Sequence, residues 1–187
     1  MKFNKASLFA AATLCLMIAP ISSMGADAEP QDTFVAFQGG QVPIEGKSRT
    51  EIYDVPGFNE KGWAEVKAFS AGVSTNGDAR SGVNLDDVVF SKYLDVASTA
   101  LFINAVNGAV FEEVAFVTRT NQKSFYVVTL KNAVIKSIKQ TQEGDNEAEE
   151  RVSLDYQTIC MKTLSSDTDG RLGGRDQCFD KATGSVY

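Results

Sequence analysis

Alternation of apolar and polar residues with a period of two runs through most of the chain and predicts β-strands. The predicted strands cover residues 33–37, 64–73, 83–90, 114–118, 125–130, 134–138 and 152–160. Two longer stretches, 124–139 and 149–162, are rich in β-branched and aromatic residues and are long enough to wrap around a closed sheet. The pattern therefore predicts an all-β architecture with one helix, either a barrel or a sandwich.

One helix is predicted over residues 96–106. Asp95 can cap its start, and Asn107 with Gly108 ends it. No charged residue lies between Asp95 and Glu112, so the helix lacks an ordinary solvated face. Such a helix is buried on more than one side, and we expect the second partner to be another subunit. The alternative is a helix buried within its own core.

Residues 41–62, the excursion, interrupt the alternation after the first strand. The segment carries Pro43 and Pro56, several glycines and charges of both signs, which predicts an irregular path. Loops of this length inside a compact domain are usually functional or form interfaces. We expect an interface-forming excursion, with a mobile surface loop as the alternative.

The first 28 residues have the pattern of a Sec-type signal peptide. Lys2 and Lys5 precede an uncharged, mostly apolar run over 6–24, and Ala26-Asp27-Ala28 offers a small-x-small cleavage site. The alternative, an uncleaved membrane anchor, is disfavoured by a proline and small residues late in the run. Cleavage after residue 28 predicts a secreted or periplasmic protein that has no membrane attachment afterwards.

Export changes the interpretation of the three cysteines. Cys15 is removed with the signal peptide, while Cys160 and Cys178 remain as an even pair in a compartment where disulfides persist. We expect a Cys160–Cys178 disulfide, because closing a loop of about 18 residues stabilises a fold by on the order of 3 kcal/mol. The alternative is two separate buried thiols.

Composition narrows the chemistry that the chain can perform. It has no His, which removes the commonest metal ligand and every His-dependent nucleophile. It carries 18 Lys and Arg against 24 Asp and Glu without a basic cluster, which argues against nucleic acid and anionic membranes as partners. Adjacent carboxylates at 86–87 and 112–113 point to opposite faces of a strand and form no acid–base couple. We predict no catalytic residue, no cofactor and no metal.

Two local patterns have both a chemical and a structural interpretation. In residues 165–176, four residues fall at positions 3, 5, 6 and 12 of a calcium loop, but position one is Ser165 and the flanks are not helical. These four are Asp167, Asp169, Gly170 and Asp176. We expect a turn there, with a weak calcium site as the alternative. Trp63 can stack on a sugar, but at a strand entrance it is more often part of the core or of an interface.

Three segments of the chain resemble a known family. They are VFSKYLD at 89–95, FYVVTLKNAVI at 125–135 and ERVSLDY at 150–156. The chain resembles the Hcp family, the tube proteins of bacterial type VI secretion systems, roughly over residues 34–162. The order of elements is also similar, including the lone helix after the Ser-Lys-Tyr motif.

This resemblance implies a two-sheet β-barrel with one flanking α-helix over residues 29–162. It implies a structural protein and not an enzyme. Proteins of the family form homohexameric rings that stack into a tube, hold small effector proteins in the lumen and meet a spike protein. The C-terminal tail, residues 163–187, has no counterpart that we can match, and we expect the disulfide to tie it down.

The resemblance also places the assembly contacts on the predicted helix and on the excursion. The expected subunit-interface residues are Val96, Ala100, Ile103 and Val106. The expected ring-stacking residues are Gln41, Glu45, Lys47, Arg49 and Asp54.

The predicted signal peptide departs from the family, whose members assemble in the cytoplasm. One interpretation is a tube homologue translated from a later start such as Met17 or Met24. Another is an exported relative that acts as a soluble binding or structural protein in the periplasm or medium, without a type VI tube; the pair Cys160 and Cys178 favours it. A third class, a secreted carbohydrate-processing or hydrolytic enzyme on a β-sandwich, needs convergent carboxylates in a deep pocket.

The exported chain is expected to begin at Glu29 and to carry one disulfide. Its intact mass should match residues 29–187 and should rise by about two hydrogens on reduction, because each cysteine gains one. Mass spectrometry of protein recovered from the periplasm or medium measures both values. A mass that includes residues 1–28 would contradict cleavage, and an unchanged mass on reduction would contradict the disulfide.

Overall fold

A computed structural model describes residues 31–53, 55–75, 83–121, 123–166, 172–174 and 176–187. The predicted signal peptide lies outside these residues, as does Asp54 of the excursion. Asp167, Asp169 and Gly170 of the candidate calcium loop also lie outside them.

The chain forms one helix and a series of strands in the described residues, and all but a few of the strands belong to one sheet. The first elements are β1 (Gln31–Gly39), β2 (Ala64–Val66), β3 (Ala68–Ser70), β4 (Val73–Thr75), β5 (Val83–Leu85), β6 (Val88–Tyr93) and α1 (Val96–Val106). Long strands follow, namely β7 (Val110–Thr120), β8 (Lys123–Thr141), β9 (Glu149–Asp155) and β10 (Thr158–Thr163). The tail adds β11 (Ser165–Ser166), β12 (Leu172–Gly173), β13 (Asp176–Asp180) and β14 (Ser185–Val186). The helix has the predicted bounds, whereas the predicted strand over 64–73 is divided among three short strands.

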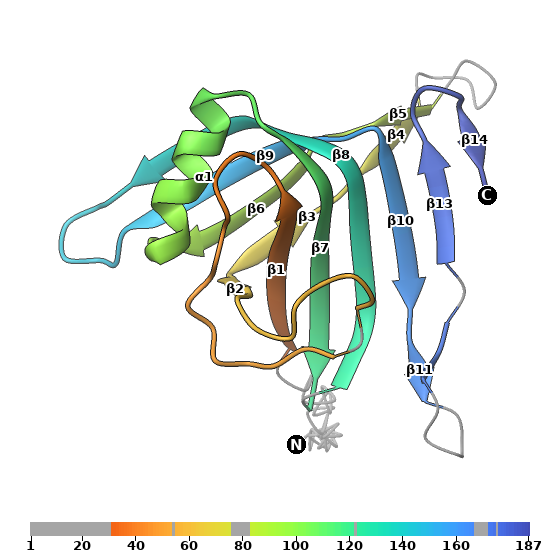
Figure 1. The fold of residues 1–187 in the computed structure, drawn as a ribbon, viewed down its shortest axis with the longest axis horizontal. Helices are drawn as coiled ribbons and strands as arrows, with labels where there is room; N and C mark the ends of the chain where they lie inside the picture. Colours follow the sequence, from red (N-terminus) through yellow and green to blue (C-terminus); the bar gives the residue numbers. More distant parts are fainter. Residues whose placement is uncertain (1–30, 54, 76–82, 122, 167–171, 175) are drawn as a thin grey trace, which may run out of the picture.

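A single antiparallel ladder connects β3, β6, β9, β8, β7, β1 and β2 in that order. Its two ends, β2 and β3, are separated in the chain by Lys67 alone, whose N–H donates to the carbonyl of Ser91 at 2.8 Å. One short segment therefore lies along both ends of the ladder, β2 on β1 and β3 on β6. Figure 1 shows the resulting curl, with β6 and β9 behind β1 and β7. The structure establishes a mainly β fold with one large sheet; among the described strands, no pairing of β2 with β3 closes it into a barrel.

The sheet bends where β8 changes partner from β10 to β9. The first part of β8 pairs with β10, and its second part pairs with β9. At the bend Asn132 has a positive φ of 50°, which Asn tolerates better than most residues, and its amide donates to the side chain of Gln157 at 2.9 Å. The predicted continuous strand over 152–160 is therefore interrupted at Tyr156 and Gln157.

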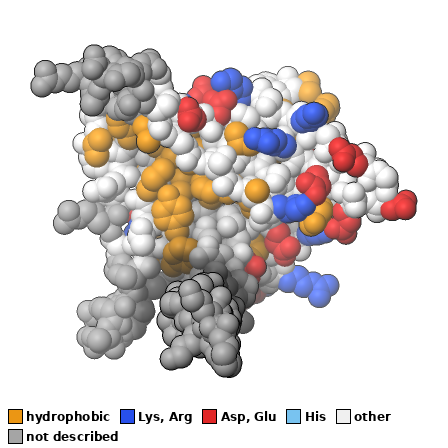
Figure 2. Space-filling view, turned by 180° about the vertical axis from the view of Figure 1, so that it is seen from behind, with side chains coloured by type: hydrophobic (Ala, Val, Ile, Leu, Met, Phe, Trp, Pro, Cys, Tyr) orange, Lys and Arg blue, Asp and Glu red, His pale blue; other side chains and the backbone are white. Residues whose placement is uncertain are grey.

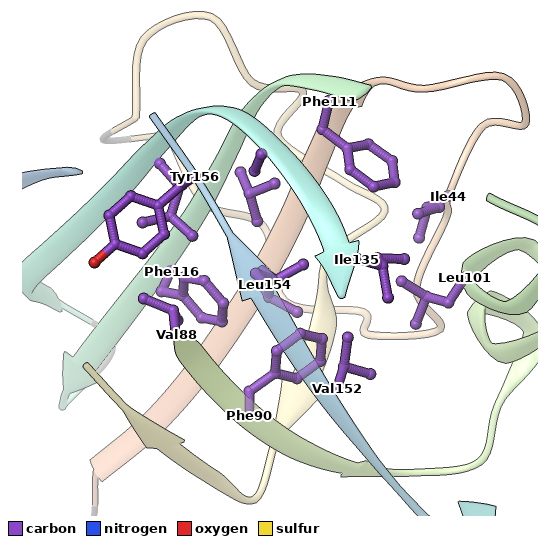
Figure 3. Packing of buried hydrophobic residues seen from close by; sticks show 14 of the residues in the cluster. Ile44, Val88, Phe90, Leu101, Phe111, Phe116, Ile135, Val152, Leu154 and Tyr156 are labelled. Carbon is purple, nitrogen blue, oxygen red and sulfur yellow. The ribbon is translucent and has the colours of Figure 1, made fainter. Parts of the chain in front are cut away.

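The inner cluster is the main hydrophobic core and lies inside the curl of the sheet. Strands β6, β7, β8 and β9 supply most of its residues, and Phe90 and Phe116 meet edge to face with ring centroids 5.5 Å apart. Figure 3 shows Leu101 reaching this cluster from α1, beside Ile44 and Ile135. Full burial of such side chains contributes roughly 1.5–3 kcal/mol each, so the helix is part of the core on its inward side.

The excursion covers the other face of the same sheet. Four successive residues of β7, from Val114 to Val117, are buried, which requires cover on both faces because neighbours in a strand point in opposite directions. The outer cluster provides that cover with Ile52, Val55 and Trp63. The Trp63 indole is fully buried and its N–H donates to the carbonyl of Asn59 at 2.9 Å. Trp63 therefore belongs to the core and is not a platform for a sugar.

The tail extends the sheet beyond β10. Strand β13 pairs with β10, and β14 pairs with β13. Cys160 and Cys178 face each other in this register and form a disulfide, with their Cα atoms 4.0 Å apart. The N–H of Cys178 donates to the carbonyl of Tyr187 at 2.9 Å, on the side away from β10. The two cysteines thus form a non-hydrogen-bonded pair, in which side chains of antiparallel strands lie closest together.

Replacing Trp63 is expected to loosen the excursion. Trp63→Ala should lower the free energy of unfolding by about 3–5 kcal/mol, because it empties the centre of the outer cluster. Tyr53→Ala is the control on the same segment; Tyr53 is 63% exposed, so its loss should cost under about 0.5 kcal/mol. Urea unfolding of both variants measures the difference. If Trp63→Ala were as stable as Tyr53→Ala, the outer cluster would not contribute to the stability of the fold.

Candidate functional site

The outward face of α1 is apolar and exposed. Val96 is 70% exposed and Val106 is 71% exposed, with Phe102 and Ile103 between them at 51% and 39%. Ala100, the remaining predicted interface residue, is half-buried and packs against the inner cluster. The alternative of a helix buried within its own core is therefore wrong, because this face has no cover within the described chain. A contiguous exposed apolar surface of this kind marks a contact site for another protein.

Local sequence fixes where α1 begins. The Asp95 side chain accepts from the backbone N–H of Ala97 at 2.9 Å, and the Ser98 hydroxyl receives the N–H of Asp95 at 3.0 Å. This reciprocal capping box satisfies donors that the first helical turn otherwise leaves unpaired. The helix ends at Asn107, whose N–H donates to the carbonyl of Ile103 at 3.0 Å.

A buried ion cluster fixes where α1 lies on the sheet. The Lys92 ammonium, 1% exposed, donates to a carboxylate oxygen of Asp95 at 2.6 Å and lies 3.0 Å from a carboxylate oxygen of Glu150. The Ser98 hydroxyl donates to the same Glu150 oxygen at 2.7 Å, and Gln140 donates to the other at 3.2 Å. The cluster thus joins β6, β8 and β9 to the first turn of α1. Buried charges persist only when they are paired and hydrogen-bonded in this way.

Sequence reasoning quoted Lys92 only as part of a family motif and missed its burial. A signal was present, because Val88, Phe90 and Lys92 alternate along β6 and all point inward. An inward Lys requires an inward acid, and Glu150 lies directly opposite Lys92 in the β6–β9 register. Pairing of β6 with β9 was the missing information.

Asn104 joins α1 to the root of the excursion. Its side-chain oxygen accepts the N–H groups of Gln41 at 2.8 Å and Val42 at 3.1 Å. Its amide group donates to the carbonyls of Val42 at 2.7 Å and Ala100 at 2.9 Å. Gly40 precedes this contact with a φ of +84°, and a Cβ there would lie 2.7 Å from the Phe111 ring. The helix and the start of the excursion are therefore held as one unit.

The predicted ring-stacking residues lie on the open side of the excursion. Four of them lie among the described residues, and all four are exposed: Gln41, Glu45, Lys47 and Arg49. In contrast, Ile44 points into the inner cluster and Ile52 into the outer cluster. Nearby, Lys61 pairs with Glu51 at 3.0 Å. The excursion thus presents polar and charged groups outward while its apolar side chains hold it to the protein.

Besides the disulfide, Lys181 holds the tail to the sheet near its bend. The Lys181 ammonium donates to Asp155 at 2.7 Å and lies 3.9 Å from the centre of the Tyr156 ring. The hydrogen bond from Lys181 lowers the pKa of the Asp155 carboxyl, so this contact is complete above the ordinary pKa and is lost as pH falls through the lowered one. Burial raises the pKa of the Tyr156 phenol to about 12, and its hydroxyl donates to the carbonyl of Asp86 at 3.0 Å.

Charge is distributed unevenly over the surface. On the face in Figure 2, Lys, Arg, Asp and Glu side chains gather on one side of a band of hydrophobic side chains. Surface ion pairs include Lys67 with Glu149 and Lys136 with Asp87, the latter 3.0 Å apart. In contrast, α1 carries no charge at all.

The described part of the chain offers neither a metal site nor a membrane span. No group of three or more His, Cys, Asp or Glu side chains gathers there around a point that could hold a metal ion. Among the described residues, no helix is long and apolar enough to cross a membrane.

The described chain is thus a curled antiparallel sheet with one helix, and the outward face of this helix carries no charge. A family model described as "Type VI secretion system effector, Hcp" matches residues 34–162. This match covers more than half of the sequence, and the chain belongs to the Hcp family. Membership of this family supports a structural role in type VI secretion.

Solved structures show the same fold. Hcp1 from Salmonella typhimurium matches with a TM-score of 0.66 and 19% identity, over 84% of this chain and 99% of that one. A type VI secretion system effector from Yersinia pestis matches with a TM-score of 0.63 and 19% identity, over 80% and 99%. The secreted protein Hcp3 from Pseudomonas aeruginosa matches with a TM-score of 0.56 and 18% identity, over 79% and 98%. No curated protein matches the sequence.

Removing the Lys92 charge is expected to destabilise the fold strongly. Lys92→Met should cost about 3–5 kcal/mol of unfolding free energy, because it leaves buried carboxylates without their cation. The double variant Lys92→Met/Glu150→Gln should recover part of that loss, since one of the unpaired charges is then gone. Lys139→Met changes an exposed Lys of β8 and is the control. Denaturant titrations measure all three, and a Lys92→Met variant as stable as the control would contradict the role of the cluster.

Proposed function

We propose that the chain is a tube subunit whose copies form a homohexameric ring through α1. The observation that carries this proposal is the uncharged outward face of the helix, with Val96, Ile103 and Val106 exposed. Leaving such a surface in water is unfavourable, and covering it releases roughly 25 cal/mol for each Å² of apolar area. Membership of the Hcp family supports the ring as the arrangement that covers it.

Ring closure needs a head-to-tail contact, in which α1 of one subunit meets a different surface of the next. Such heterologous contacts form a closed ring when the rotation between neighbours divides a full turn. Within each subunit, we propose that the segment 64–70 completes a two-sheet barrel, since its two strands lie on β1 and β6 at opposite ends of the ladder.

The excursion is proposed as the contact between stacked rings. Its exposed groups, among them Glu45, Lys47 and Arg49, are polar and of both signs. Contacts between such groups are weakened by salt, because exposed charges are screened within about 10 Å at 0.1 M ionic strength. Stacking should therefore respond to salt, whereas the apolar ring contact should not. Asp54 belongs to the same proposed contact.

The remaining parts of the proposed function follow from the tube. A ring of barrels encloses a lumen for small effector proteins, and its end is the place where a spike protein would bind. Release of the protein into the medium is proposed on the same basis, since one of the structural relatives is described as a secreted protein.

A second candidate function is supported by the Cys160–Cys178 disulfide. Disulfides persist in oxidising compartments, which agrees with the signal peptide predicted over residues 1–28. On this proposal the chain is an exported relative that keeps the family fold and acts as a soluble binding or structural protein without a type VI tube. The two candidates differ in their oligomeric state.

Charge on the α1 face is expected to abolish the ring. Val106→Glu should convert a hexamer of residues 29–187 into monomers, because a carboxylate in the contact would be buried without a partner. Val186→Glu is the matched control, since Val186 is 69% exposed but lies in β14. Size exclusion with light scattering measures the mass. A hexameric Val106→Glu variant would overturn the interface, and a monomeric parent chain would favour the second candidate.

A further inference from the structure

The disulfide lies in an open groove on the outer face of the sheet. Thr129 of β8, Cys160 of β10 and Cys178 of β13 are neighbours across three strands and all line this groove. Pro56 and Phe58 of the excursion line it as well. The groove has a volume of about 250 Å³, and both cysteines are partly exposed. The disulfide is therefore within reach of a molecule that enters from solution.

Two ammonium groups line the same groove, together with the two carboxylates that pair with them. Lys131 lies 3.7 Å from a Glu113 oxygen and Lys162 lies 3.5 Å from an Asp176 oxygen, so both ion pairs are loose. Lys131 and Lys162 remain partly exposed. Positive groups near a disulfide favour an approaching thiolate and stabilise the thiolate that leaves. The groove thus offers a setting suited to thiol–disulfide exchange.

The outer strands of the tail bury little apolar surface, and the backbone ladder to β10, a few polar contacts and the disulfide hold them in place. Phe179 is the tail residue that packs against the inner cluster, while Val186 and Tyr187 are 69% and 66% exposed. Polar contacts complete the attachment, with Thr158 donating to Asp180 at 3.2 Å and Lys181 donating to Asp155. A short strand pair with so little buried apolar area is marginal on its own.

We propose that the Cys160–Cys178 disulfide is a site of reduction by dithiols that enter this groove, and that its reduction releases β13 and β14 from β10. A thiolate of the dithiol attacks one cysteine sulfur, the S–S bond breaks and a mixed disulfide forms. The second thiolate of the dithiol then displaces that cysteine, and the dithiol becomes a disulfide. Two electrons pass from the dithiol to the pair, and Cys160 and Cys178 take up protons as thiols.

Release of the tail changes the surface of the protein. With β13 in place, the backbone groups on the outer side of β10 are paired. Without β13 they form a free strand edge, which is a template for another strand. Reduction therefore moves the free edge of the sheet from β13 and β14 to β10, independently of whether α1 forms a ring.

The first measurement is the reduction of residues 29–187 by dithiothreitol in native buffer, with alkylation and intact mass to count free thiols. We expect both cysteines to be reduced without denaturant, at a rate that stays constant over urea concentrations below the unfolding transition. A rate that rises in proportion to the unfolded fraction would show that the disulfide opens only by global unfolding, and this would overturn access through the groove.

Two charge variants test the groove itself. With the anionic thiol mercaptoethanesulfonate, Lys162→Gln should be reduced a few-fold more slowly than the parent chain, because one positive group at the entry is gone. Lys139→Gln removes an equally charged residue that does not line the groove, and its rate should be unchanged. Equal effects of the two variants would contradict a local role of the groove.

Hydrogen exchange of the reduced chain tests release of the tail. Amides of β10, β13 and β14 should lose protection, while those of β7 and β8 in the inner cluster keep it. The variant Cys160→Ser/Cys178→Ser should show the same pattern without any reductant. Full protection of β13 in both samples would overturn tail release, and this outcome is separate from the oligomeric state that tests the proposed ring.

Discussion

The position of α1 depends on one buried cation. Lys92 enters the protein from β6 and meets Asp95 and Glu150, so the start of the helix and two strands share a single charge cluster. The cost of burying these groups is offset only while all of them are present, because a buried charge without its partner is far more costly than an apolar replacement of the pair. The outward face of α1 can therefore be uncharged along its whole length, since the attachment of the helix does not rely on that face. A surface free of charge becomes available for contact with another chain.

The helix α1 and the excursion, the two surfaces proposed for assembly, are joined to each other by direct contacts. Asn104 holds Gln41 and Val42 to the helix, and Ile44 packs beside Leu101 in the inner cluster. Farther along, the excursion is anchored to the opposite face of the sheet by Trp63 and its neighbours. A displacement of α1 would therefore shift the root of the excursion but not its far end. The helix and the root of the excursion are thus coupled through Asn104 and through the packing of Ile44 beside Leu101.

Much of the architecture could be predicted because it depends on local pattern. The bounds of α1 follow from the Asp95 cap and the Asn107-Gly108 end, and strand alternation predicted most of β1, β8 and β9 and the middle of β7. What escaped prediction depends on pairing between distant segments. The bend at Asn132, the splitting of 64–73 and the burial of Lys92 each require knowledge of the strand opposite. The candidate site divides in the same way: the uncharged helix was evident, whereas the residues that fix its position were not.

The place of β1 in the sheet also bears on when the fold can form. This strand begins within a few residues of the predicted cleavage site, yet the partner along its whole length is β7, with Gln31 opposite Thr120. Contacts so far apart in sequence form slowly, because a long loop must close before they contribute. A nascent chain would have to expose β7 before its first strand could join the sheet. The order of strands thus keeps the sheet incomplete until most of the chain has been synthesised.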